Sequence, residues 1–221
     1  MNMQVQALIQ AAGAGVRLGL GPKAFVRLDG STLLERAIAT VSGLVSDVIV
    51  AVPETLIAPA RALVEGARVT VIAGGCSRSE TTRLLVEAAR APWLLLHDVV
   101  HPFVTADLVA ALLAAAQEHG AAAPGITNTE FLYSPDGDLL HAPGDVLVGQ
   151  KPVAFARQPV ADLYARRPAA PASADPSFLE LLRLAGTPAR FVPGAGGNIK
   201  VTCPDDLRFA EALLALGRRA S

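Results

Sequence analysis

The amino-acid sequence predicts an α/β protein built on a doubly wound, mostly parallel sheet. Aliphatic runs alternate with stretches of helical spacing over the first 125 residues, the pattern of a sheet with helices on both faces. Hydrophobic residues form 52% of the chain and aromatic residues only 5%, which favours buried parallel strands over an aromatic-rich β-sandwich. Each connection is long enough for a right-handed crossover. The 221 residues predict one domain, 1–221.

Five strands are predicted before residue 127, because each is a short apolar run that ends at glycine, proline or a polar residue. These runs occupy residues 5–10, 47–53, 68–75, 93–98 and 121–126. Apolar residues at helical spacing predict the intervening helices, at 32–41, 56–66, 79–90 and 107–120. Thr32 and Glu35 open the first helix with the spacing of a capping box.

The alternation stops after residue 126. Residues 131–150 contain a Pro135-Asp136-Gly137 turn between two strand-like pieces, which predicts a hairpin. We expect this insertion, at about 128–150, to project as an arm. Beyond it, the pattern predicts helices at 157–166, 177–186 and 204–217, and a last strand over 189–202 with a glycine-rich interruption.

Composition and charge exclude several classes of protein. Nineteen Lys and Arg residues against twenty Asp and Glu residues give a net charge of −1, which argues against a nucleic-acid-binding surface. No apolar run approaches the length of a membrane span, and the start of the chain lacks the cationic region of a signal peptide. Cys76 and Cys203 show no metal-ligand or disulfide-framework spacing. We therefore expect a soluble, cytoplasmic protein that binds neither nucleic acid nor a membrane.

Residues 11–25 form the most informative segment. Gly13 and Gly15 let the backbone approach a ligand and point its N–H groups at phosphate oxygens. Arg17 and Lys23 follow six residues apart, and two mobile cations beside fixed backbone donors suit the triphosphate of a nucleotide. A flexible surface loop with two solvated cations is the alternative.

Two known glycine loops do not match this segment. The dinucleotide-binding fingerprint needs a third glycine where Leu18 stands. A P-loop needs Ser or Thr directly after its lysine, where Ala24 stands. A Rossmann-type oxidoreductase is disfavoured further, because Val52 and Pro53 end the second strand in place of an acidic residue.

Asp98 ends the fourth strand, at the edge where ligands bind in parallel sheets. A single carboxylate there is a usual Mg²⁺ ligand when phosphates complete the coordination shell; an N-cap or turn residue is the alternative. His97 and His101 lack the further partners that a zinc site needs. After the third strand, residues 73–82 combine glycines with Arg78 and hydroxyls, which suits either a ligand at a helix N-terminus or an ordinary capped helix start.

Lys200 stands between β-branched residues in a strand-like pattern. An inward-pointing lysine at a strand end is costly unless it meets an anion. Cys76 follows a glycine pair but has no nearby base, so we do not expect it to act as a nucleophile.

Together these segments resemble the 2-C-methyl-D-erythritol 4-phosphate cytidylyltransferases of the non-mevalonate isoprenoid pathway, from about residue 5 to residue 216. The motifs that carry the resemblance are, in order, Ala11-Ala12-Gly13-x-Gly15-x-Arg17, Pro22-Lys23, Gly74-Gly75 with Arg78, His97-Asp98 before Pro102, and Asn198-Ile199-Lys200-Val201-Thr202 with Pro204 and Asp206-Leu207. Many nucleotidyltransferases share the glycine loop, whereas the motif near the end is more specific.

The resemblance implies a Rossmann-like nucleotidyltransferase that transfers CMP from CTP to a polyol phosphate with the help of Mg²⁺. It also implies a homodimer in which the arm of each subunit reaches into the partner's site. The nucleotide-binding residues would be Ala11, Ala12, Gly13, Ala14, Gly15, Gly74, Gly75, Thr81 and Asp98. The catalytic residues would be Arg17, Lys23 and Lys200, with Asp98 also binding the metal. The acceptor-binding residues would be Thr129, Arg157, His101 and Lys151.

The sequence departs from the family pattern on the acceptor side. His101 stands where the family has arginine, and Asn128-Thr129 replaces an Asp-Thr pair. A cation of the family becomes Phe131, and a Thr-Pro-Gln motif becomes Lys151-Pro152-Val153, so that Lys151 restores some of the lost charge. Of a Thr-Asp-Asp/Glu segment only Ser173-Ala174-Asp175 is left.

Three functions follow from these features. The first is transfer of CMP to 2-C-methyl-D-erythritol 4-phosphate, and the second is transfer to another polyol phosphate such as ribitol 5-phosphate. The third is a nucleotide-binding protein without turnover. The intact set of Arg17, Lys23, Asp98 and Lys200 argues against this third function, because a site without chemistry has no need of it.

Overall fold

An eight-stranded sheet forms the centre of the protein, as seen in a computed structural model that describes residues 3–166 and 175–220. Its strands are β1 (Val5–Gln10), β4 (Asp47–Val52), β5 (Val69–Ala73), β6 (Trp93–Asp98), β7 (Ala121–Thr127), β10 (Leu147–Gly149), β11 (Val153–Ala156) and β12 (Arg190–Pro193). The helices are α1 (Leu33–Ser42), α2 (Ile57–Leu63), α3 (Arg78–Ala88), α4 (Ala106–His119), α5 (Arg157–Arg166), α6 (Phe178–Leu184) and α7 (Pro204–Ala220). No helix among the described residues is long and apolar enough to cross a membrane.

Parallel pairing dominates the sheet and confirms the predicted class. β1 lies between β4 and β6, and β4 pairs with β5, all in parallel. The register places Gln10, at the end of β1, beside Asp98, at the end of β6. The carboxyl ends of these strands therefore meet at one edge of the sheet, where ligands bind in open α/β folds.

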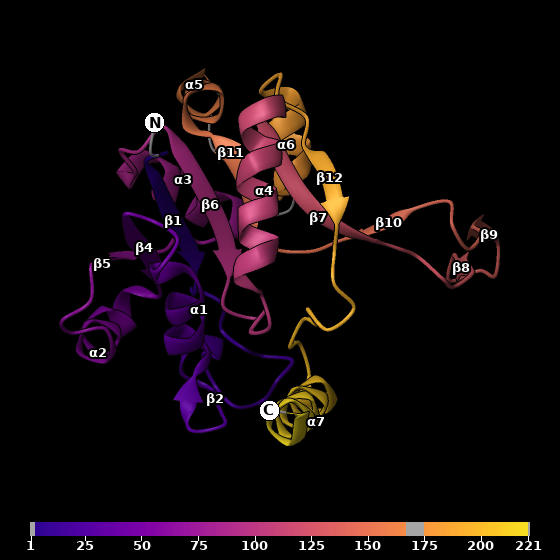
Figure 1. Cartoon of the computed structure of the whole chain (residues 1–221), viewed down its shortest axis with the longest axis horizontal. Helices are drawn as coiled ribbons and strands as arrows, with labels where there is room; N and C mark the ends of the chain where they lie inside the picture. Colours follow the sequence, from indigo (N-terminus) through magenta and orange to yellow (C-terminus); the bar gives the residue numbers. More distant parts are fainter. Residues whose placement is uncertain (1–2, 167–174, 221) are drawn as a thin grey trace.

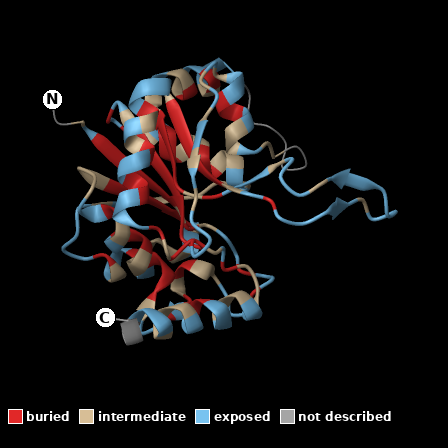
Figure 2. Ribbon diagram, turned by 45° about the vertical axis from the view of Figure 1, so that its right-hand side comes forward, coloured by how far each residue is buried: buried red, intermediate tan, exposed pale blue. Residues whose placement is uncertain are grey.

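Helices cover both faces of the sheet (Figure 1). Alternate residues of β1 point to opposite faces: Ala7 and Ile9 belong to one apolar cluster, and Leu8 to the other. The first cluster packs under α1 and α4, and the second under α3, α5 and α6. The central strands β1, β4, β6 and β11 are accordingly the most buried part of the molecule (Figure 2), which explains their continuous apolar sequences.

The first helix begins as predicted. Thr32 accepts a hydrogen bond from the Glu35 backbone N–H, and the Glu35 carboxylate accepts one from the Thr32 N–H at 2.7 Å. These bonds lower the pKa of the Glu35 carboxyl. Before this helix the chain forms a 3-10 turn, η1 (Lys23–Phe25), and a short hairpin of β2 (Arg27–Leu28) and β3 (Ser31–Thr32); a second turn, η2 (Glu54–Leu56), precedes α2.

The predicted arm is a hairpin that projects from the sheet (Figure 1). Its strands are β8 (Leu132–Tyr133) and β9 (Leu139–His141), and Ser134 and Asp138 close the turn through a backbone hydrogen bond of 2.8 Å. The arm is shorter than the predicted segment, because β10 leaves it and pairs antiparallel with β7. Cross-strand pairing with a seven-residue strand holds residues 147–149 in the main sheet.

β11 is a strand that the sequence pattern does not predict. It pairs antiparallel with both β6 and β7, so a reversed strand lies in the middle of the sheet. Its four residues are too few for a periodic signal. The predicted strand at 189–202 is also wrong in extent: only residues 190–193 pair, with β7, and the glycines that follow end the strand.

Phe155 of β11 anchors the second apolar cluster. Its side chain is fully buried and meets the Phe178 ring edge-on, with ring centroids 4.8 Å apart. We expect Phe155→Ala to lower the free energy of unfolding by about 3–5 kcal/mol, because it removes the ring contact and leaves a cavity. Urea denaturation measures this change. The matched variant Phe209→Ala removes a ring that is 64% exposed and should cost less than about 1 kcal/mol; equal losses would contradict the assigned packing.

Candidate functional site

Two adjoining cavities lie at the carboxyl ends of β1, β5 and β6. The larger, of about 510 Å³, lies beneath residues 12–17 and is called the loop cavity. The smaller, of about 180 Å³, lies between β6, α3 and α6 and is called the inner cavity. Four residues line both: Gln10, Arg78, Asp98 and Lys200. The two cavities therefore share a polar wall.

The glycine loop has the geometry that its sequence predicts. Gly15 has a φ of +73°, and an added Cβ would overlap the carbonyl oxygen of Gly21. The Gly15 carbonyl in turn accepts hydrogen bonds from the N–H groups of Leu18, at 2.9 Å, and Gly19, at 3.1 Å. Only glycine fits this position, and the turn that it permits keeps the loop open toward the cavity.

Four cations among the described residues border the loop cavity: Arg17, Lys23, Lys200 and, in the wall shared with the inner cavity, Arg78. The Lys23 ammonium donates hydrogen bonds to the carbonyl oxygens of Val201, at 3.1 Å, and Thr202, at 3.4 Å. Burial lowers the pKa of Lys23, and the positive charges of Arg17 and Lys200 lower it further. The loop cavity therefore holds positive charge that an anion would stabilise. Lys200 itself lies outside any strand, contrary to the strand-end position expected from its neighbours.

Among the predicted nucleotide-binding residues, Ala12, Gly13, Ala14, Gly15, Gly75, Thr81 and Asp98 line the loop cavity. Ala11 and Gly74 lie behind that surface instead. The N–H of Ala11 bonds to the carbonyl of Ala51 at 2.9 Å, and an added Cβ on Gly74 would lie 2.6 Å from that of Ala12. Gly74 therefore lets the loops that follow β1 and β5 pack closely, while Ala11 continues the pairing of β1 with β4.

Thr81 positions the second glycine segment. Its buried hydroxyl accepts a hydrogen bond from the Gly75 N–H at 3.1 Å and donates one to the Ser77 carbonyl at 2.8 Å. Ser77 also caps α3 by accepting from the Glu80 N–H. The hydroxyls of this helix start therefore shape the loop from within, while its backbone faces the cavity.

Asp98 is the carboxylate of the shared wall. It is 9% exposed, and its Oδ1 atom has no hydrogen-bond partner among the described residues. A buried, unpaired carboxylate oxygen is costly unless a cation or donor reaches it. No group of three or more metal-ligating side chains lies in the described part of the chain. The arrangement fits a single-carboxylate Mg²⁺ site in which phosphates and water supply the other ligands.

The histidine before this aspartate has a different role. His97 is fully buried, neither ring nitrogen has a partner within the described residues, and burial lowers its pKa to about 3. It is therefore neutral at physiological pH. It lies within β6 and lines neither cavity, so its role is structural.

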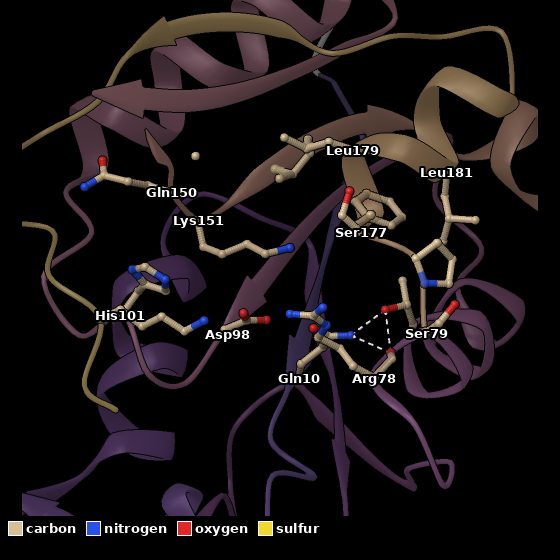
Figure 3. Close-up of a pocket in the computed structure, with 16 residues that line it drawn as sticks. Gln10, Arg78, Ser79, Asp98, His101, Gln150, Lys151, Ser177, Leu179 and Leu181 are labelled. Carbon is tan, nitrogen blue, oxygen red and sulfur yellow. Dashed lines mark hydrogen bonds between the residues drawn. The ribbon is translucent and has the colours of Figure 1, made fainter. Parts of the chain in front are cut away.

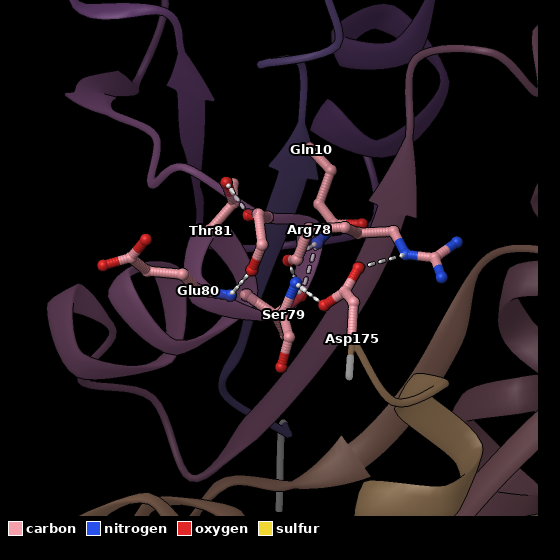
Figure 4. A network of polar contacts seen from close by, with 8 residues as sticks. Gln10, Arg78, Ser79, Glu80, Thr81 and Asp175 are labelled. Carbon is pink, nitrogen blue, oxygen red and sulfur yellow. Dashed lines mark hydrogen bonds and ion pairs between the residues drawn. The ribbon is translucent and has the colours of Figure 1, made fainter. Parts of the chain in front are cut away.

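Arg78 and Gln10 belong to a polar network at the N-terminus of α3 (Figure 4). The Gln10 amide donates to the Arg78 carbonyl at 3.1 Å and to the Thr82 hydroxyl. Asp175 accepts a hydrogen bond from the Ser79 N–H at 2.8 Å and pairs with the Arg78 guanidinium at 3.8 Å. The carboxylate thus stabilises the positive end of the helix and orients the arginine.

The inner cavity contains two of the predicted acceptor residues, His101 and Lys151 (Figure 3). Burial lowers the pKa of His101, so the imidazole is mainly neutral near pH 7. Burial also lowers the pKa of Lys151, opposed by the negative charge of Asp98. Lys151 and Asp98 point into the same space (Figure 3).

The structure does not bring the other two predicted acceptor residues to this site. Arg157 follows β11, which runs antiparallel to β6, and its N–H bonds to the carbonyl of Pro92 at 2.9 Å. It therefore lies at the far end of β6 from Asp98. Thr129 is exposed at the base of the arm, outside both cavities. Ser173 and Ala174, of the altered acceptor motif, lie outside the described residues.

Sequence reasoning assigned no role to four residues that build the site. Gln10 is a strand residue in the sequence pattern, and Phe178 is one apolar position of a predicted helix. Asp175 stands out there only as the remainder of an altered acceptor motif, and its contact with α3 is visible only in the structure. Asn198 is 1% exposed and donates its amide N–H to the Lys151 carbonyl at 2.8 Å. Its position in the Asn198-Ile199-Lys200 motif was the only available signal.

Comparisons with known proteins agree with this geometry. The sequence model of the 2-C-methyl-D-erythritol 4-phosphate cytidylyltransferase family matches residues 5–216. A curated protein of that name from Thermus thermophilus is 39% identical over 216 residues, 96% of this chain and 97% of the relative. Another, from Deinococcus radiodurans, is 39% identical over 211 residues, covering 94% and 88% of the two chains.

Solved structures give the same result. The crystal structure of a 2-C-methyl-D-erythritol 4-phosphate cytidylyltransferase from Thermus thermophilus superimposes with a TM-score of 0.79 and 32% identity, over 96% of this chain and 98% of the other. The Francisella tularensis protein of that name has a TM-score of 0.78 at 19% identity, over 95% and 99% of the chains. This second likeness concerns the fold alone.

The lowered pKa of Lys23 predicts a pH dependence. Its positive charge is lost at a lower pH than that of an ordinary lysine, so the affinity for CTP should fall as the pH rises toward the normal lysine range. Lys23→Arg should keep its affinity to higher pH, because guanidinium remains charged up to about pH 12. Calorimetric titration with CTP from about pH 6 to about pH 10, a range that brackets the ordinary lysine value, measures both profiles. The control variant Arg61→Lys, on the exposed side of α2, should leave the pH profile of CTP affinity unchanged. If the profiles of Lys23→Arg and the parent protein superimposed, the role of Lys23 would be contradicted.

Proposed function

The chain belongs to the 2-C-methyl-D-erythritol 4-phosphate cytidylyltransferase family, and from this premise we propose that the loop cavity binds CTP and the inner cavity binds the acceptor. The protein is a nucleotidyltransferase: it transfers CMP from CTP to 2-C-methyl-D-erythritol 4-phosphate and releases pyrophosphate, a step of the non-mevalonate route to isoprenoid precursors. The observation that carries the proposal is the shared wall of Gln10, Arg78, Asp98 and Lys200, because donor and acceptor must meet where the new bond forms.

The reaction needs little covalent help from the protein. A phosphate oxygen of the acceptor attacks the α-phosphorus of CTP, forming a P–O–P bond as the bond to the β-phosphate breaks. A phosphate monoester has a second pKa of about 6 and is largely dianionic at pH 7, so no general base is required. The wall shared by the two cavities accordingly presents the cations Arg78 and Lys200. Catalysis then consists of positioning and electrostatic stabilisation.

The cations divide this work. Arg17 and Lys23 line the loop cavity alone, whereas Lys200 lines both cavities. We assign Arg17 and Lys23 to the triphosphate and the leaving pyrophosphate, and Lys200 to the α-phosphate between donor and acceptor. Charge on the equatorial oxygens grows in the transition state, and fixed cations are most effective where water is partly excluded.

We assign Mg²⁺ to Asp98. Its unpartnered Oδ1 atom and its place in the shared wall support this choice. When bound, Mg²⁺ would neutralise charge on the phosphates of CTP.

Cytoplasmic location stays a prediction from the sequence.

The inner cavity also favours one acceptor over the alternative. Its wall includes Val153, Phe178, Leu179 and Leu181, an apolar surface that suits the methyl branch of methylerythritol phosphate. Ribitol 5-phosphate has no such branch. Burying one methyl group contributes about 0.8 kcal/mol, a modest preference in binding.

A single assay tests the function. The protein is incubated with CTP, Mg²⁺ and either 2-C-methyl-D-erythritol 4-phosphate or ribitol 5-phosphate, and pyrophosphate release is followed. We expect release with the methylerythritol substrate and about four-fold lower kcat/KM with ribitol phosphate, because both acceptors offer a phosphate to the cations and only the first has a methyl group to bury against the apolar wall. Release with ribitol phosphate alone would assign the second acceptor. Nucleotide binding without release from any acceptor would support a protein without turnover.

We further propose that the arm mediates a homodimer. Phe131, Tyr133, Leu139 and Leu140 are each more than half exposed on it, and the hairpin projects away from the sheet with its strands exposed (Figure 2). An isolated two-stranded hairpin is marginally stable in water, and a cluster of exposed apolar side chains is typical of an interaction surface. In such a dimer, Thr129 is the candidate contact to the partner's acceptor.

Deleting residues 132–142 should yield monomers, because it removes most of the apolar surface of the arm. Light scattering at several concentrations measures the oligomeric state. Phe209→Ser, which removes an equally exposed ring from α7, should leave the dimer intact. A dimer that survives the deletion, or one that Phe209→Ser dissociates, would contradict this role of the arm.

A further inference from the structure

Lysine is rare in this protein and is concentrated at one place. The chain contains only three lysines, Lys23, Lys151 and Lys200, and its remaining basic side chains are arginines and histidines. All three lysines line the two cavities. Two of them belong to the nucleotide machinery proposed above, which leaves Lys151 to be explained.

Lys151 lines the inner cavity and not the loop cavity. Among the described residues, the other arginine and lysine side chains of the inner cavity, Arg78 and Lys200, line both. Lys151 is therefore the one strongly basic residue, in the described part of the chain, that is specific to the acceptor side.

The backbone and stem of Lys151 are held in place. Asn198 donates its side-chain N–H to the Lys151 carbonyl at 2.8 Å, and the preceding residue, Gln150, bonds to the carbonyls of Ala195 and Asn198 at 2.9 and 3.2 Å. The ammonium lies 5.4 Å from the centroid of the Phe178 ring, which itself packs on Phe155. A contact with an aromatic face orients a cation but leaves its three donors available.

The charge of the inner cavity is unbalanced. Asp98 is the one carboxylate among its described lining residues, against Arg78, Lys151 and Lys200. Arg78 already pairs with Asp175, whereas no hydrogen bond or ion pair joins the Lys151 ammonium to any described residue. Asp98 offsets part of the cost of burying this cation, and an anion bound in the cavity would stabilise the remaining positive charge. His101 supplies little charge, because burial keeps it mainly neutral.

We propose that Lys151 binds the phosphate of the acceptor directly and is the residue that restricts this site to phosphomonoesters of small polyols. The inference rests on the proposed function and deepens it. The inner cavity, of about 180 Å³, has room for a small sugar-alcohol phosphate and not for a second nucleotide. Because the same phosphate is the nucleophile, Lys151 both selects the acceptor and orients the attacking oxygen toward the shared wall.

The three-lysine composition allows a direct binding test. Protein produced with ¹³Cε-labelled lysine should give three ε-methylene resonances, each assigned by its disappearance in a Lys→Arg variant. The α,β-methylene analogue of CTP is added first and should shift Lys23 and Lys200. Adding 2-C-methyl-D-erythritol 4-phosphate should then shift Lys151, whereas the unphosphorylated tetrol should not.

The outcomes separate this inference from the proposed function. If the enzyme releases pyrophosphate with methylerythritol phosphate while the Lys151 resonance stays in place, the inference fails and the function stands. If the tetrol shifts Lys151 as much as its phosphate does, the phosphate is held elsewhere. If no acceptor supports turnover, the proposed function fails, and with it the role of Lys151 as an acceptor residue.

Kinetics provide a second measurement on the complete enzyme. Lys151→Met keeps the unbranched stem and removes the charge. We expect the KM for the acceptor to rise at least about ten-fold, which is equivalent to about 1.4 kcal/mol. The KM for CTP should change less than about two-fold. Lys151→Arg should restore part of the loss. Arg61→Met, outside both cavities, is the matched control. Equal losses toward CTP and acceptor, or no rescue by arginine, would overturn the assignment.

Discussion

A cluster of like charges at one edge of the sheet is the constraint on which the site depends. Arg17, Lys23 and Lys200 come from opposite ends of the chain, and their mutual repulsion adds to burial in lowering the pKa of Lys23. The carbonyls of Val201 and Thr202 accept hydrogen bonds from the Lys23 ammonium. The negative charge of Asp206 offsets part of the repulsion on Lys23. Carbonyl dipoles keep the ammonium in place and leave its charge for a polyphosphate.

The acceptor side depends on a second device, a reversed strand placed between parallel ones. β11 runs back along β6, so the residues just before it lie beside Asp98 while those after it lie at the other end of the sheet. Lys151 precedes the strand and enters the inner cavity; Arg157 follows it and is carried away. Asn198 then ties the Lys151 backbone to the segment that bears Lys200. This hydrogen bond links the backbone of Lys151, on the acceptor side, to the segment that carries Lys200 into the shared wall.

The fold class, the glycine loop and Asp98 were predictable because each depends on local sequence and on the rule that parallel strands end at one edge. The capping box of Thr32 and Glu35 is local in the same sense. The acceptor side was less predictable, because it depends on which way a four-residue strand runs. The resemblance to the family placed Arg157 among the acceptor-binding residues. Because β11 pairs antiparallel with β6, Arg157 instead lies at the opposite end of β6 from Asp98. Gln10, Asp175 and Asn198 act through contacts between residues far apart in sequence, which no periodicity reveals.

The bond between Lys23 and Val201 joins residues separated by 178 positions. Contacts of such long range form late, since the entropy of closing the loop must be met before they contribute. During synthesis, a chain that has left the ribosome only as far as α6 has its glycine loop and Asp98 but lacks Lys200 and the carbonyls that hold Lys23. We therefore expect nucleotide affinity to emerge only near the completion of translation, so that a prematurely released chain does not sequester CTP.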